Sequence, residues 1–127
     1  MKVNDLKEYL KAQFPDVSFF NGSINKTSKQ CVGLYVVGGV KPHIAIGGLQ
    51  NTTFGKLPVR ILVHWTEDSN QADIQAQSIH DHLMCLVTEI NNKKVSFELL
   101  DSTPIDIGRD SNNICERVIR AIITYER

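Results

Sequence analysis

Histidines, cysteines and carboxylates are the side chains of this chain that could bind a metal ion or catalyse a reaction. The four histidines are His43, His64, His80 and His82. His80 and His82 stand two residues apart in a segment with helical periodicity, so they point to different faces and do not share a metal ion. The sequence contains no Cys-x-x-Cys pair, and these spacings predict no metal site. We expect His64, on a predicted strand, to be a partly exposed surface residue.

Nucleophilic catalysis needs a serine or cysteine beside a base and an oxyanion hole. No Gly-x-Ser-x-Gly motif occurs, and Cys31, Cys85 and Cys115 lie far apart in apolar stretches. That placement is typical of small core residues in a reducing compartment. The dipeptide Gly55-Lys56 lacks the flanking residues of a phosphate-binding loop. We therefore expect no catalytic residue and no cofactor.

The densest polar patch is the run from Asp106 to Asp110, Asp-Ile-Gly-Arg-Asp. It could be a ligand-binding loop, but a turn that returns the last strand to the sheet is the stronger interpretation. Other acidic residues, such as Asp68 and Asp101, have simpler interpretations as helix caps or turn residues. Paired carboxylates for acid–base chemistry are therefore not indicated.

Length and charge limit the possible classes of protein. The chain has 127 residues, which is enough for one domain. It carries 14 Lys and Arg residues against 14 Asp and Glu residues, so its formal net charge is zero. Proteins that bind nucleic acids or anionic membranes usually need a basic surplus, and no apolar run reaches the roughly 18–20 residues of a membrane span. We therefore expect neither partner. A neutral chain repels its own copies weakly, which permits self-association.

The first part of the chain predicts a helix, a loop and a strand. Residues 3–13 have apolar side chains at helical spacing, and Pro15 ends the helix. Residues 21–29 are turn-forming and predict a loop. Residues 31–37 are β-branched and aromatic and predict a strand.

A long excursion follows, at about residues 38–57. It contains Pro42 and several glycines and shows little periodicity. A loop of this length is unusual in a compact domain and usually has a function. The alternative is a loop that contains a short strand at residues 44–46.

The middle of the chain predicts a strand followed by the longest helix. Residues 58–66 alternate between apolar and polar side chains, which is typical of a strand. Asp68 is the expected N-cap of a helix over residues 70–90, whose apolar residues recur every three or four positions. The asparagines at 91–92 are expected to end that helix.

The last part predicts strands. Residues 94–100 form one, and a short pairing at 105–107 interrupts the polar connection 101–113. Residues 114–126 fit either a helix or a strand, and their many β-branched side chains favour the strand. The order of elements indicates an α+β fold, in which a mostly antiparallel β-sheet has two main helices packed on one face.

Three stretches in the second half of the chain form a recognisable pattern. The first is Pro58-Val-Arg-Ile-Leu-Val-His64, followed after a polar turn by Ala72-Asp-Ile-Gln-Ala-Gln-Ser-Ile-His-Asp-His-Leu83. The second is Pro104-Ile-Asp-Ile-Gly-Arg-Asp110, and the third is the closing segment 114–127, which ends in Tyr-Glu-Arg. Together they resemble the tail terminator proteins of long-tailed bacteriophages, also described as minor capsid, tail completion or head–tail joining proteins. The first half of the chain is similar to the family in layout only.

The resemblance implies a structural virion protein with no turnover and no cofactor. Residues 1–127 would form a single tail-terminator-like domain. Six copies would form a ring that caps the tail tube, terminates its polymerisation and offers a surface to the head. The implied partners are other copies of the chain in a homohexamer, the tail tube protein and the head connector or completion protein. The implied location is the head–tail junction, after assembly in the host cytoplasm.

The resemblance also suggests where contacts lie. His64 stands where the family commonly has arginine at the end of the strand. Arg109 and Asp110, in the predicted turn, are candidates for subunit or partner contacts. The excursion at residues 40–56 is a candidate contact arm.

Two other classes of function stay open. A small non-catalytic adaptor would bind one partner through an exposed sheet edge and would be monomeric alone. A small ligand-binding domain or enzyme would need polar residues that converge in a pocket. For that class, His64, His82 and Asp106 are the first residues to test.

Overall fold

The computed structural model describes residues 1–22, 30–38, 41–42 and 44–127 of the chain. The predicted loop at 21–29 lies almost entirely outside the described residues. The elements in chain order are α1 (Val3–Gln13), β1 (Ser18–Asn21), β2 (Cys31–Val36), the 3-10 turn η1 (Leu49–Asn51), β3 (Phe54–His64), α2 (Ser69–Leu83), β4 (Val87–Ile90), β5 (Lys93–Leu99), β6 (Ile105–Arg109) and β7 (Cys115–Glu126).

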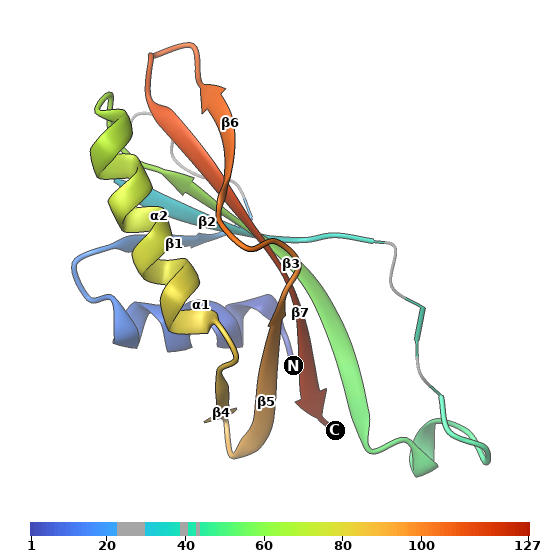
Figure 1. Cartoon of the computed structure of the whole chain (residues 1–127). Coiled ribbons are helices and arrows are strands. Elements are labelled where there is room, and N and C mark those ends of the chain that lie inside the picture. Colours follow the sequence, from blue (N-terminus) through green and yellow to red (C-terminus); the bar gives the residue numbers. More distant parts are fainter. Residues whose placement is uncertain (23–29, 39–40, 43) are drawn as a thin grey trace.

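The strands of the described part form one curled sheet of seven strands (Figure 1). Their order is β1-β2-β3-β7-β5-β4, and β6 also pairs with β7. The β1–β2 pair is parallel, whereas the other pairs are antiparallel. The two longest strands, β3 and β7, form the central pair, from Phe54 opposite Glu126 to His64 opposite Glu116. The predicted α+β fold with a mostly antiparallel sheet is confirmed.

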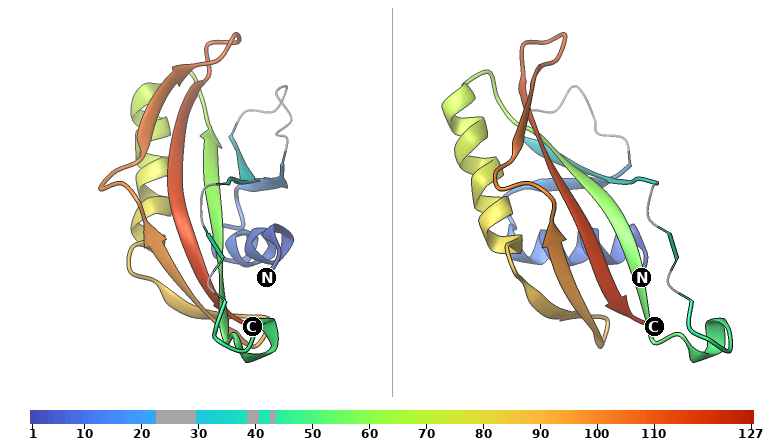
Figure 2. Two further views of the ribbon diagram at one scale, coloured as in Figure 1. Left: turned by 90° about the vertical axis from the view of Figure 1, so that its right-hand side faces the viewer. Right: turned by 45° about the vertical axis from the view of Figure 1, so that its right-hand side comes forward.

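The core lies between the helices and one face of the sheet. Val59 and Ile61 of β3 stand opposite Ala121 and Ile119 of β7, and all four are buried. Successive residues of a strand alternate between faces, so these four share the face that both helices cover (Figures 1 and 2). No described helix lies over the opposite face. The buried helix residues are Val3, Leu6 and Leu10 in α1 and Ala72, Ala76, Ile79, His80 and Leu83 in α2.

Several predicted elements are confirmed. The helix at 3–13 is α1, and the strands at 31–37, 58–66 and 94–100 are β2, β3 and β5. The closing segment 114–126 is a strand, β7, as its β-branched residues indicated. Asp68 is the N-cap of α2, and its side chain accepts a hydrogen bond from the backbone N–H of Asn70 at 2.9 Å.

The second helix is shorter than predicted. The helix expected over residues 70–90 ends at Leu83, and Val87–Ile90 is the strand β4. Asn91 and Asn92 end no helix but form the turn of the β4–β5 hairpin, with φ values of 53° and 64°. Positive φ at both positions is the geometry that favours a two-residue hairpin turn. The prediction was too long because Ile90 of β4 is also buried in the core, and its position in the sequence happens to continue the apolar spacing of α2.

The first half of the sheet contains two further differences. The four-residue strand β1, which pairs with β2, was not predicted, because it is too short to show a clear alternation. The alternative strand at residues 44–46 is wrong, since the described part of that segment is irregular up to η1. The excursion also ends earlier than expected, at Thr53, because β3 begins at Phe54.

Candidate functional site

Two of the predicted contact residues lie where β6 meets the turn to β7, at one end of the sheet (Figure 1): Arg109 is the last residue of β6, and Asp110 is the first residue of the turn. The carboxylate of Asp110 accepts hydrogen bonds from the backbone N–H groups of Asn112 and Ile114, both at 2.9 Å. Gly108, with φ of 94°, lies at the bulge before the turn, where glycine is favoured. Asp110 therefore shapes the turn. The rest of the polar run, Asp106 to Arg109, belongs to β6, so the turn interpretation is correct only for Asp110.

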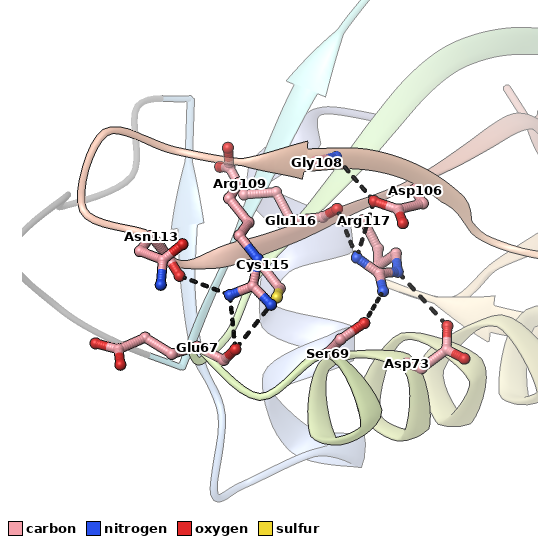
Figure 3. Close-up of polar contacts among 10 residues, drawn as sticks. All are labelled: Glu67, Ser69, Asp73, Asp106, Gly108, Arg109, Asn113, Cys115, Glu116 and Arg117. Atoms are coloured by element: carbon pink, nitrogen blue, oxygen red, sulfur yellow. Dashed lines mark hydrogen bonds and ion pairs between the residues drawn. The ribbon is translucent and has the colours of Figure 1, made fainter.

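Arg109 fastens the turn to the segment that precedes α2 (Figure 3). Its exposed guanidinium donates hydrogen bonds through Nη1 to the carbonyl oxygens of Glu67, at 2.7 Å, and Asn113, at 3.0 Å. Both acceptors are backbone carbonyl groups rather than carboxylates. The positive charge therefore stays at the molecular surface, where a guanidinium can bind a negative group of a partner.

His64 is fully buried, which corrects the expectation of a partly exposed residue. Strand register explains the burial, because His64 is flanked by Cys31 in β2 and Glu116 in β7. Its Nδ1 atom lies 3.2 Å from a carboxylate oxygen of Glu116 and 3.7 Å from one of Asp110. The structure therefore brings His64 and Asp110 together. The Arg109 side chain instead contacts the backbone of Glu67, in the segment before α2.

Cys31, His64 and Glu116 form a row across three adjacent strands. A cysteine, a histidine and a carboxylate are also the residue types of a nucleophilic site. Cys31 is fully buried, and burial together with the Glu116 carboxylate raises the pKa of its thiol. A raised pKa keeps the thiol protonated at neutral pH, whereas the nucleophile must be a thiolate. Burial and the neighbouring carboxylate therefore both oppose formation of the thiolate.

Arg117 is a buried cation that the sequence reasoning did not single out (Figure 3). Its guanidinium donates to Ser69 Oγ at 3.0 Å and to Asp106 Oδ1 at 3.1 Å, and its Nε lies 3.5 Å from Asp73 Oδ1. Two-residue alternation places Arg117 on the same buried face as Ile119. A charge in an apolar row indicates carboxylate partners, so this break in the alternation was the signal that could have revealed the network.

Asp101 and Arg120 form a second ion pair, between the β5–β6 connection and β7. The Nε and Nη2 atoms of Arg120 donate to the two carboxylate oxygens at 2.8 and 2.7 Å. These hydrogen bonds hold the pKa of Asp101 below its ordinary value. His80 Nε2 lies 3.0 Å from the Asp101 carbonyl oxygen, and a carbonyl only accepts, so this nitrogen carries the hydrogen. α2 is thus joined to the same connection.

The residues first to be tested for an enzyme or ligand site have separate partners. His64 contacts Glu116, Asp106 pairs with Arg117, and His82 Nε2 lies 3.2 Å from the hydroxyl of Tyr9 in α1. Within the described ranges, no group of three or more His, Cys, Asp or Glu side chains is arranged to hold a metal ion. These residues therefore do not form one polar pocket.

Two of the three cysteines are buried. Cys31 and Cys115 are buried core residues as predicted, but Cys85 is exposed, in the connection after α2. Among the helices that the structure describes, none is long and apolar enough to span a bilayer.

Residues 44–53, which precede β3, lie away from the body of the sheet and contain the short turn η1 (Figure 1). We call residues 44–49 the arm tip and residues 50–54 the base of the arm. Thr52 organises the tip, because its hydroxyl accepts a hydrogen bond from the Ala45 N–H at 2.9 Å and donates to the Gly48 carbonyl at 3.1 Å. Despite this order, the tip exposes three large apolar side chains: Ile44, Ile46 and Leu49.

Comparison with known proteins gives a match over almost the whole chain. The profile of a family described as "Bacteriophage tail terminator protein" matches residues 5–127, from within α1 to the end of the chain. A search of curated proteins found no match.

Proposed function

Because this chain belongs to the bacteriophage tail terminator family, we propose that it forms a ring that caps the finished tail tube. Membership makes the chain a structural component of the phage tail and of the virion. In the proposed role, the ring stops polymerisation of the tube and then offers a surface to the head connector at the head–tail junction. The proposed partners are other copies of the chain in a homohexamer, the tail tube protein and a head connector or completion protein.

The observation that carries this proposal is the arm tip. Its side-chain hydrogen bonds hold apolar residues in contact with solvent, and Ile46 is fully exposed. Exposed apolar patches on an ordered scaffold are typical of protein–protein contacts. Self-association also meets little electrostatic opposition, since the net charge is zero.

The β6–β7 turn supplies a second candidate contact, at the opposite end of the molecule from the arm tip (Figure 1). A ring between the tube and the head needs a contact surface at both ends. The proposed contact residues are Arg109, the last residue of β6, and Asp110, the first residue of this turn. The buried His64 acts behind them, because its Nδ1 faces Asp110.

The mass of the purified protein at several concentrations, alone and with tail tubes, tests the proposal. We expect a discrete ring, and tubes that stop growing once they are capped. Arg109→Glu should weaken joining to heads. A matched charge reversal at Lys11→Glu, exposed on α1, should not. A protein that stays monomeric in every condition would contradict the ring. If Arg109→Glu joins heads normally, the turn is not a contact surface for the head.

A further inference from the structure

Two exposed surfaces lie near the C-terminus of the chain, and we propose that they bind each other between neighbouring copies of the chain. One is the arm tip, and the other is a groove between the base of the arm and the β4–β5 hairpin. This inference rests on the ring proposed above and assigns the contact that would hold its subunits together.

The arm tip has the properties of a preformed apolar knob. No charged residue occurs from Ile44 to Phe54. Gly47 and Gly48 have φ values of 102° and 93°, which favour glycine and allow the tight turn at the tip. A knob that is already folded loses little conformational entropy when it binds.

The groove has a volume of about 590 Å³, within the range of about 300–1,000 Å³ that is typical of pockets. Phe54, Val87 and Tyr125 supply apolar walls, and Lys94 and Glu126 lie among the polar residues that line it. Val87 stands on β4, the last strand of the sheet on this side of the described part. Most of the lining residues are polar or charged, so the groove is a mixed surface with one apolar patch, as protein-binding surfaces often are.

Exposure links the two surfaces. Of the large hydrophobic side chains that the structure describes, Ile46 in the tip and Val87 in the groove are the most exposed, at 102% and 71%. The apolar side chains of the tip do not line the groove of their own chain, whereas the base of the same arm forms one of its walls. The tip that binds in the groove would therefore come from a second copy.

The symmetry of such a contact agrees with a ring. The tip and the groove are different surfaces of one chain, so the contact is heterologous, and heterologous contacts generate closed rings when the rotation between copies closes. The neutral chain and the uncharged tip add no repulsion between copies.

Charge substitutions on each surface provide the first test. Ile46→Asp and Val87→Asp should each reduce ring formation by about tenfold or more, because an aspartate resists burial against apolar groups. Ile74→Asp is the control, since Ile74 is a similar aliphatic side chain, 56% exposed on α2. All three variants should unfold at the wild-type temperature, because the substituted side chains are exposed. Ring formation is measured as mass in solution and on tail tubes.

Disulfide trapping provides the second test, in a Cys85→Ser background that removes the exposed native thiol. Chains with Ile46→Cys mixed with chains with Val87→Cys should form cross-linked dimers under mild oxidation. The double variant should form a ladder of cross-linked species up to the ring.

The outcomes separate this inference from the ring itself. The tip-to-groove contact would be overturned if the wild type forms rings, Ile46→Asp forms them in equal yield, and the cysteine variants do not cross-link. The proposal of a ring would then still hold. Normal rings of Ile46→Asp that fail to cap tubes would assign the tip to the tube protein and also overturn the tip-to-groove contact. A wild-type protein that forms no ring alone or on tubes would overturn both proposals.

Discussion

Arg117 places a full positive charge among the buried side chains beneath α2. Its carboxylate partners, Asp73 and Asp106, are 71% and 64% exposed, so the ion pairs run from the interior to solvent. A buried cation is tolerated when its N–H groups meet acceptors, and Ser69 at the start of α2 supplies another. The first turn of α2 is therefore held to the sheet by a polar network as well as by apolar packing.

Replacement of Arg117 by methionine tests this role. Methionine keeps much of the aliphatic stem and removes the hydrogen bonds, so we expect the free energy of unfolding to fall by about 1–3 kcal/mol. This loss of stability should be smaller than the loss on breaking a fully buried ion pair, because Asp73 and Asp106 stay hydrated when Arg117 is removed. Urea unfolding measures the change. Asp73→Asn, at the exposed end of the same network, should cost less than about 0.5 kcal/mol. Equal losses in the two variants would contradict the assignment.

Asp101 makes the stability of the protein depend on pH. Hydrogen bonds from Arg120 lower the pKa of Asp101 in the folded state. The folded protein therefore takes up this proton less readily than the unfolded chain does. The contribution is present above the unfolded pKa of about 3.9 and is lost as the pH falls through the lower folded value.

Asp101→Asn should reduce the unfolding temperature at pH 7 and should flatten its decline below about pH 4. Thermal unfolding of the variant and the wild type across this pH range checks the result. The gap between the two curves should narrow in acid. Parallel curves would show that the ion pair does not contribute to the acid sensitivity.

At the scale of elements, the β4–β5 hairpin depends on its turn. Asn91 and Asn92 both have positive φ, which asparagine and glycine tolerate better than other residues. The hairpin places Val87 beside the groove, so this turn positions one of the two proposed contact surfaces.

Two substitutions of Asn92 separate backbone conformation from side-chain effects. Asn92→Ala should lower the free energy of unfolding by about 1 kcal/mol, since alanine resists the left-handed region. Asn92→Gly should leave it unchanged or raise it slightly. Thermal unfolding measures both. If the alanine variant is as stable as the wild type, the turn does not determine the hairpin.

At the scale of the whole molecule, the two candidate contacts predict opposite responses to salt. The arm tip is uncharged, whereas Arg109 and Asp110 carry charges. Raising the salt concentration from about 0.1 M to 1 M shortens the Debye length from about 10 Å to 3 Å. We expect the yield of rings to stay constant or rise, because apolar association is not screened. Mass measurements at the two concentrations check this. A large fall in yield would assign subunit association to the polar turn instead.

The sequence by itself determined the class of fold and most of its elements. The apolar spacing of residues 3–13 and the β-branched run at 114–126 identified α1 and β7, because each period matches the repeat of one type of backbone. The resemblance carried by residues 58–83, 104–110 and 114–127 identified the family, which the match over residues 5–127 shows. Local patterns sufficed because each depends on neighbours a few residues away.

Tertiary structure alone decided which side chains meet. Strand register buries His64 between Cys31 and Glu116, residues that are 33 and 52 positions away in the chain. Helical spacing could not separate α2 from β4, because both place apolar residues in the same core. The groove beside Val87 likewise exists only where the base of the arm, β7 and the β4–β5 hairpin come together. Periodicity specifies which face of an element is buried, whereas pairing between distant segments specifies what that face touches.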